Sequence, residues 1–148
     1  MKAPYLAGRF LFGGFFVYSG LHHFLDRKSM ADYTRSKGVP APDAAVAVTG
    51  ALLLAGGASI LLGLKPKLGV AAITTALAGI SPLMHDFWRV QDPQQRMNEM
   101  ANFHKNLALA GAALALTGTG EPWPASLPAL TESKTRRNLR RVRRLLAG

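Results

Sequence analysis

Cysteine is absent from this chain, and charged residues are scarce. With no cysteine among 148 residues, disulfides, thiolate metal sites, iron–sulfur clusters and dithiol redox chemistry carried by this chain are excluded. Charged residues make up only 18 %, below the roughly 25 % that is typical of soluble domains. Acidic residues are the scarcest, eight against 18 basic ones, which leaves a formal net charge of +10. Hydrophobic residues, by contrast, make up 49 % of the chain, and they come in long blocks that indicate a membrane protein.

Four segments are each about 20 residues long, enough to cross a hydrocarbon core of roughly 30 Å, and the fourth is polar in its first half and apolar in its second. Their predicted bounds are residues 4–25, 44–64, 68–88 and 96–117. Pro42 and Asp43 mark the start of the second segment, and Pro82 interrupts the third. No small-residue cleavage site follows the first segment, so a retained helix is favoured over a signal peptide. The sequence therefore predicts an all-α fold, a four-helix transmembrane bundle that forms one domain over residues 1–119.

The first two segments are rich in glycine, and small residues let transmembrane helices approach each other closely. The glycines concerned are Gly8, Gly13, Gly14 and Gly20 in the first segment and Gly50, Gly56 and Gly57 in the second. Between these segments, the polar residues 26–42 predict a short surface helix over about residues 29–37. We therefore expect the first two segments to pack tightly against each other.

Residues 120–148 differ in composition from the rest of the chain. A proline-containing linker is predicted first, with Trp123 as an anchor at the membrane interface. Leucines and a valine then recur at helical spacing among arginines, which predicts a basic amphipathic C-terminal helix. We expect this tail to contact anionic lipid of the inner leaflet or an acidic partner subunit, and nucleic acid is disfavoured. The predicted contact residues are Arg136, Arg137, Arg140, Arg141, Arg143 and Arg144.

Four spans would place both termini on the same side of the membrane. That side carries 11 of the 18 basic residues, and the opposite side carries six of the eight acidic ones. By the positive-inside rule, the termini are predicted to be cytoplasmic. All the histidines then fall at one depth, in the outer leaflet: His22, His23, His85 and His104.

These histidines and their charged neighbours form the candidate site. Its predicted cofactor-binding residues are His23, His85, Asp86, His104 and Lys105. Ionisable groups inside a bilayer are costly, so they need a partner or a function. A haem or chlorophyll-type pigment is the less favoured ligand, because no two histidines have the i, i+4 spacing of a helical two-histidine site. No catalytic residue and no metal ligand are predicted.

Lys105 is predicted to lie inside the hydrocarbon, and three interpretations remain open for it. It can form an ion pair with Asp86 or Asp26, extend its ammonium to the outer interface, or contact an anionic or quinone-like ligand. His22 and Asp26 are four residues apart and share a helix face, so an ordinary surface hydrogen bond or a carboxylate-oriented imidazole is possible. Adjacent histidines point in different directions, so at most one of His22 and His23 faces the bundle.

Five stretches of the chain match one known family pattern in combination. They are GRFLFGGFFVYSGLHHF, SKGVPAP, LLLAGGASILLGL, HDFW and NFHKNLALAG, of which the last two together are the most specific. On these residues the chain resembles the DoxX family of small bacterial four-helix membrane proteins, over about residues 7–116. Family members often carry a lysine near the end of the first helix, where this chain has His23. They often carry a glutamate before the paired glycines of the second helix, where this chain has Leu53.

The resemblance implies the fold and adds a quinone to the possible ligands, because the family is named for a subunit associated with quinone-linked sulfur oxidation. The sequence therefore favours an accessory subunit of a membrane-bound redox or energy-transducing complex, with lipids and other membrane proteins as partners. It favours no enzymatic activity for the isolated chain. Two alternatives stay open. One is a quinone-linked oxidoreductase subunit that uses the outer His/Lys/Asp pocket, and the other is a subunit that binds haem or a pigment through histidine.

Overall fold

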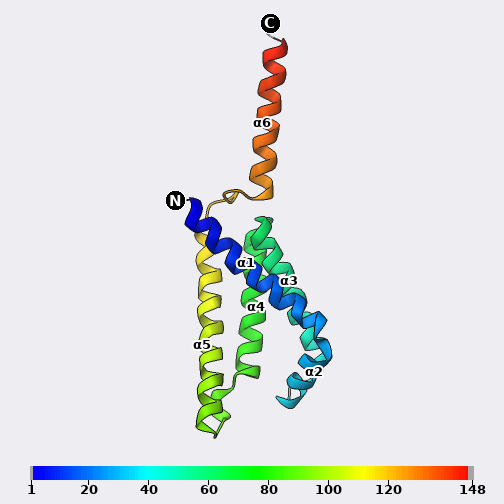
Figure 1. The fold of residues 1–148 in the computed structure, drawn as a ribbon, viewed down its shortest axis with the longest axis vertical. Helices are drawn as coiled ribbons and strands as arrows, with labels where there is room; N and C mark the ends of the chain where they lie inside the picture. The colour runs from blue at the N-terminus through cyan, green and yellow to red at the C-terminus, as the bar shows by residue number, and fades with distance from the viewer. Residues whose placement is uncertain (1, 147–148) are drawn as a thin grey trace.

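The computed structural model describes residues 2–146, except for the side chains of residues 2, 136–138 and 140–146. Within these residues the chain has six α-helices, two single-turn 3-10 helices and no strand, so the predicted all-α class is confirmed (Figure 1). In chain order the elements are α1 Lys2–Leu25, α2 Arg27–Ser36, α3 Pro42–Leu62, α4 Pro66–Met84, η1 Phe87–Arg89, α5 Pro93–Ala115, η2 Leu116–Gly118 and α6 Leu127–Leu146. Each predicted apolar segment corresponds to one long helix, with small differences at the ends.

The helices divide the molecule into two ends. The N-terminus, the turn between α3 and α4 and the end of α5 lie at the upper end, and α6 extends beyond them (Figure 1). At the lower end lie α2, η1 and the start of α5, while α1 runs diagonally across α3 and α4. This arrangement gathers residues 26–42 and residues 85–99 at the same end, although they are far apart in the sequence.

Two helices have the length and composition needed to cross a membrane. They are Pro42–Leu62, with a mean hydropathy of 2.1, and Pro66–Arg89, which takes in η1 and has a mean hydropathy of 1.4. Among the described residues, α1 and α5 do not reach the same standard. The outward face of α1 is nevertheless apolar, since Phe10, Leu11 and Tyr18 are 64 %, 77 % and 68 % exposed. That all four long helices, α1, α3, α4 and α5, cross the membrane therefore stays a prediction.

Where α1 crosses α3, several glycines leave no room for a side chain: Gly13, Gly20, Gly50 and Gly57. A Cβ atom at Gly20 would lie 2.4 Å from the backbone nitrogen of Leu54, and one at Gly57 would lie 2.7 Å from that of Val17. The other two glycines of α1 face open space: Gly8 and Gly14. The expected close contact of the first two segments is confirmed, and two of the four glycines of α1 contribute to it.

Trp123, the predicted interfacial anchor, belongs to the core. Its side chain is fully buried, and its ring lies edge-to-face against Tyr5 with ring centroids 6.0 Å apart. Its indole N–H donates to the backbone oxygen of Thr119 at 3.3 Å. Trp123 shares a buried cluster with Phe16 and Ile73. The prediction of Trp123 as an exposed anchor is therefore wrong, because the linker folds back onto α1 and buries the large indole there.

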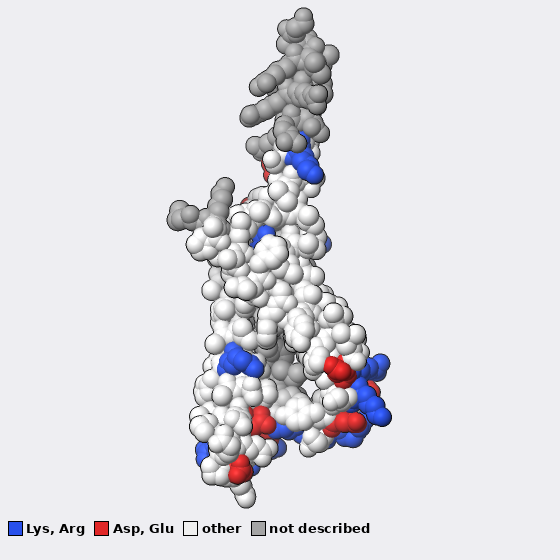
Figure 2. All heavy atoms as spheres, viewed as in Figure 1, with Lys and Arg blue, Asp and Glu red and all other residues white. Residues whose placement is uncertain are grey.

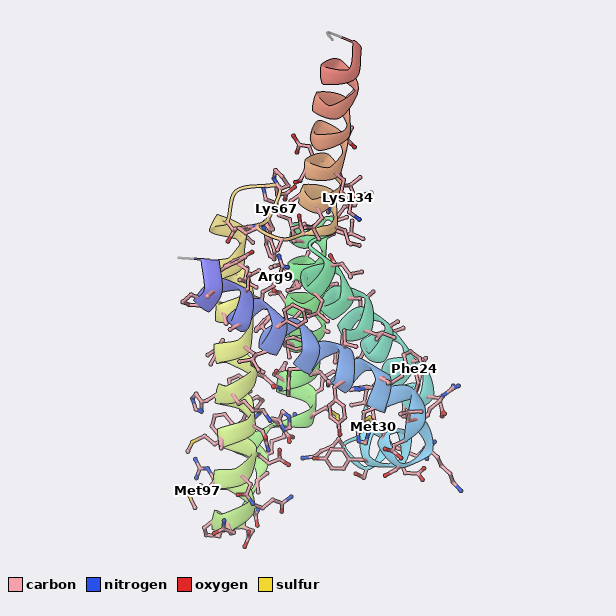
Figure 3. The ribbon with its side chains drawn as sticks, turned by 45° about the horizontal axis from the view of Figure 1, so that its top comes forward. Arg9, Phe24, Met30, Lys67, Met97 and Lys134 are labelled. Carbon is pink, nitrogen blue, oxygen red and sulfur yellow. The ribbon has the colours of Figure 1, made fainter. Side chains whose placement is uncertain are left out.

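Arg9 holds the linker in this position. Its guanidinium donates through Nη1 to the backbone oxygen of Pro124 at 2.7 Å and through Nη2 to that of Ala125 at 3.1 Å. Arg9 is only 2 % exposed, and its guanidinium lies 5.9 Å from the centroid of the Tyr5 ring. Figure 3 shows Arg9 on α1, below the linker that leads into α6. Two charge-assisted hydrogen bonds thus join the first helix to the start of the last.

Arg9→Met is expected to release this linker. Methionine keeps an apolar stem but cannot donate, and a hydrogen bond to a charged group contributes about 1.5–3 kcal/mol. The unfolding temperature of the protein should fall. The fluorescence of Trp123 should shift to longer wavelength, measured in a Trp88→Phe background so that Trp123 is the single tryptophan of the chain. Lys67→Met is the matched control, because Lys67 is exposed at the same end (Figure 3). Equal responses to the two substitutions would contradict the role of Arg9.

Candidate functional site

Four ionisable side chains meet at the lower end of the bundle. Lys37 is the C-cap of α2, His85 and Asp86 follow α4, and Glu99 lies in the first half of α5. The ammonium of Lys37 donates to Glu99 Oε1 at 2.7 Å and lies 3.8 Å from Asp86 Oδ1. The Nδ1 of His85 donates to Glu99 Oε2 at 2.8 Å. These four residues form the Lys37–Glu99 cluster, in which one carboxylate is shared between a lysine and a histidine.

The cluster is sheltered from solvent. The side chains of Glu99 and Lys37 are 9 % and 14 % exposed. Burial by itself lowers the pKa of Lys37, but the hydrogen bond with Glu99 and the surrounding charges outweigh burial, so this pKa is raised above 10.5. The raised pKa means that the pair contributes its stability fully below pH 10.5 and loses it as the pH rises through the pKa of the folded protein. Lys37 is therefore charged at neutral pH.

Lys37 and Glu99 are absent from the residues that the sequence patterns predict for the site. Glu99 lies on one face of α5 with the other buried residues of that helix, Asn106 and Ala113, at steps of seven residues. The sequence does not mark this face as buried, because it carries a glutamate, an asparagine and an alanine rather than large apolar residues. Lys37 carries no local signal either, because its place depends on how α2 folds back beside α3.

A cavity of about 410 Å³ lies next to the cluster, between α1, α2, α3 and α4. Its lining is mainly aliphatic, and it includes His23 from α1, Met30 from α2, Gly79 from α4 and His85. Figure 2 shows the molecule hollowed near its lower end beside acidic side chains, and Figure 3 labels Met30 at that end. The volume falls within the range of about 300–1,000 Å³ that small-molecule sites occupy. The cavity is therefore large enough for a small organic ligand.

Two histidines line this cavity with the same hydrogen-bonding pattern. The Nδ1 of His23, which is 9 % exposed, lies 2.7 Å from the backbone oxygen of Ser19, and the Nδ1 of His85 contacts Glu99. Because a carbonyl or carboxylate oxygen can only accept, these contacts assign the proton to Nδ1 in both rings. The Nε2 atom of each neutral ring is then a hydrogen-bond acceptor, and neither Nε2 has a partner within the described part of the chain.

Of the predicted site residues, His23 and His85 share the cavity, Asp86 joins His85 in the Lys37–Glu99 cluster, and His104 and Lys105 lie elsewhere. The last two are exposed on α5. They follow Glu99 by five and six residues, which turns their side chains about 120–140° around the helix from the buried face. In the described residues, no group of three histidine, aspartate or glutamate side chains could hold a metal ion.

The interpretation of Lys105 as an ion-pair partner is wrong. Its ammonium donates to Asn102 Oδ1 at 2.9 Å, on the same helix. Both predicted partners are engaged elsewhere, since Asp86 belongs to the Lys37–Glu99 cluster and Asp26 lies 2.8 Å from His22 Nδ1. The contact between His22 and Asp26 confirms the predicted surface pair, because the two side chains are 43 % and 54 % exposed.

The predicted lipid or partner contacts fall on α6, and their side chains lie outside the described residues. They are Arg136, Arg137, Arg140, Arg141, Arg143 and Arg144. The backbone of α6 is helical through this region, as the spacing of leucine and valine predicts. Their contacts with lipid or protein stay a prediction.

Fold and site together define a small all-α membrane protein with a histidine-lined cavity at one end of its helices. The chain belongs to the DoxX family, since the DoxX family model matches residues 5–86, more than half of its length. The match runs from α1 to the end of α4, so it includes both histidines of the cavity and stops short of Glu99. No curated protein and no solved structure shows significant similarity to the chain.

Proposed function

We propose that this DoxX protein is an accessory subunit of a membrane redox complex and that it binds a quinone-type molecule in the cavity between α1, α2, α3 and α4. The observation that supports this is the presence of two imidazole rings, from His23 and His85, on one otherwise mainly aliphatic cavity. A membrane quinone has an apolar tail and ring oxygens, so it needs apolar walls with a few polar groups that fix its orientation.

The Lys37–Glu99 cluster would prepare His85 for this role. A carboxylate behind an imidazole fixes its tautomer and its ring orientation, and Glu99 contacts Nδ1 of His85 in this way. The ammonium of Lys37 donates to Glu99 and so holds the carboxylate that orients His85. When bound, the quinone would supply the electron-transfer chemistry, and the protein would supply binding and orientation.

The proposed topology has α1, α3, α4 and α5 as four spans of a bacterial inner membrane, with both termini cytoplasmic. In support, the N-terminus and the start of α6 lie at the same end of the molecule (Figure 1). The cavity and the Lys37–Glu99 cluster would then lie in the outer half of the bilayer, where an apolar ligand can enter from the lipid.

The accessory role follows from what the chain contains. It has no cysteine for an iron–sulfur cluster or a dithiol, so electrons would have to come from another subunit. The outward face of α1 offers large apolar side chains for lipid or a neighbouring membrane protein, among them Leu11 and Leu25 at 77 % and 73 % exposure. Basic α6 offers a second surface, suited to anionic lipid or an acidic subunit.

Gly79→Leu is expected to weaken quinone binding by roughly tenfold or more while the fold is kept. Gly79 lines the cavity, and an added Cβ atom would meet nothing within 4 Å, so a leucine would occupy the cavity without a clash. Gly111→Leu is the matched control, because Gly111 also faces open space but does not line the cavity. Calorimetric titration of the purified chain with decylubiquinone measures the difference. Equal affinities of the two variants would contradict this cavity as the binding site.

The subunit role has a separate test. Purification in mild detergent should recover this chain together with other membrane proteins, and mass spectrometry should identify redox subunits among them. A chain that runs alone and remains stable under the same conditions would contradict an accessory role, whatever the result of the ligand titration.

A further inference from the structure

We infer that the cavity selects a ligand that donates hydrogen bonds, the dihydroxy (quinol) form rather than the dicarbonyl (quinone) form. This inference rests on the proposed function and concerns the redox state in which the ligand is held. It follows from the chemistry of His23 and His85, which both line the cavity and both have Nδ1 engaged by an accepting oxygen.

His85 carries the first part of the inference. Its Nδ1 donates to Glu99 Oε2 at 2.8 Å, and Glu99 in turn accepts from Lys37 at 2.7 Å. An ionised carboxylate cannot donate, so the single proton of a neutral His85 ring lies on Nδ1 and the opposite Nε2 carries a lone pair. A hydroxyl group can donate to this lone pair, whereas a carbonyl oxygen placed there would face it with a lone pair of its own.

His23 repeats the pattern from another helix. Its Nδ1 contacts the backbone oxygen of Ser19 at 2.7 Å, and that oxygen can only accept. The Nε2 of His23 is therefore also an acceptor when the ring is neutral. Two Nε2 acceptors can each receive a hydrogen bond from a ligand ring that carries two hydroxyl groups. A ligand ring that carries two carbonyl groups would receive no hydrogen bond from either imidazole.

The other polar groups of the cavity do not reverse this preference. The hydroxyl of Thr34 already donates to the backbone oxygen of Met30 at 2.7 Å. The hydroxyls of Tyr33, Thr49 and Thr75 can rotate, so each can donate or accept and serves both redox forms alike. The imidazoles are therefore the groups that distinguish the two forms, and His23 and His85 are the specificity-determining residues.

Three matched probes test the inference: decylubiquinol, decylubiquinone and the dimethyl ether of decylubiquinol, which has the shape of the quinol but no hydroxyl donor. Each is titrated into the full-length protein by calorimetry, anaerobically and at mildly alkaline pH, where imidazole is neutral. The quinol should bind roughly threefold to tenfold more tightly than either of the others for each hydrogen bond that it donates.

His85→Gln provides the matched variant. Glutamine can both donate and accept, so the variant should lose the part of the quinol preference that comes from His85, roughly threefold to tenfold, and keep the part that comes from His23. If the wild type binds the quinone or the dimethyl ether as tightly as the quinol, the inference is wrong and the proposed function stands. If the wild type binds none of the three, the proposed function itself is wrong.

Discussion

Gly20→Ala should destabilise the protein by about 3 kcal/mol, whereas Gly14→Ala on the same helix should stabilise it slightly. Alanine inside a helix is favoured over glycine by roughly 0.5–1 kcal/mol, and this gain is available at Gly14, which faces open space. At Gly20 the new Cβ atom would lie 2.4 Å from the backbone nitrogen of Leu54 and 2.8 Å from the backbone oxygen of Gly50. Because these are backbone atoms, α1 and α3 would have to move apart to accommodate it.

Thermal unfolding of the purified proteins in one detergent, followed by tryptophan fluorescence, distinguishes the two substitutions. Gly57→Ala is a second variant from the other side of the same contact, since its Cβ would lie 2.7 Å from the backbone nitrogen of Val17. It should lower the unfolding temperature as Gly20→Ala does. A Gly20→Ala protein as stable as the wild type would show that α1 and α3 are further apart than described here.

The same helix crossing positions the proposed binding site. A Cβ atom at Gly50 would lie 2.7 Å from the Cβ atom of His23, so the absence of a side chain at Gly50 lets His23 approach α3. His23 then lines the cavity together with residues of α3 and α4. The glycine pattern of the first two segments is thus a condition for the cavity as well as for the fold.

The helices could be predicted because their signals are local. Pro42 stands in the first turn of α3, where its missing N–H is not needed, and Gly63 ends that helix with a φ of 65°. Asp92 caps α5 by accepting from the backbone nitrogen of Gln95 at 2.7 Å. Signals of this kind depend on a few neighbouring residues, and a single sequence contains them.

The Lys37–Glu99 cluster could not be predicted, because its contact joins residues that are 62 positions apart. Counting residues along α5 predicts a depth for Lys105 in a bilayer but says nothing of the direction in which its side chain points. That direction depends on which face of α5 packs against α4, and the buried face contains Glu99. Trp123 was misplaced for a related reason, since nothing local in the linker shows that Arg9 binds it from α1.

Lys37→Met should destabilise the protein strongly, and Lys105→Met should leave its stability unchanged. Without the Lys37 ammonium, the carboxylate of Glu99, which is only 9 % exposed, keeps His85 as its one remaining donor. The carboxylate of Asp86 also loses the nearby ammonium. Removing one partner of a buried ion pair costs about 3–5 kcal/mol. The side chain of Lys37 is 14 % exposed and the cluster lies at the end of the bundle, so we expect a loss of about 3 kcal/mol.

Thermal unfolding in a single detergent compares these two lysine variants directly. The double variant Lys37→Met/Glu99→Leu should recover part of the lost stability, because it also removes the carboxylate that the single substitution leaves unpaired. Such a recovery would show that the loss comes from the unpaired charge and not from the missing stem of Lys37. If Lys105→Met were the destabilised variant instead, Lys105 would be the paired lysine, and the buried face of α5 would not be the face that contains Glu99.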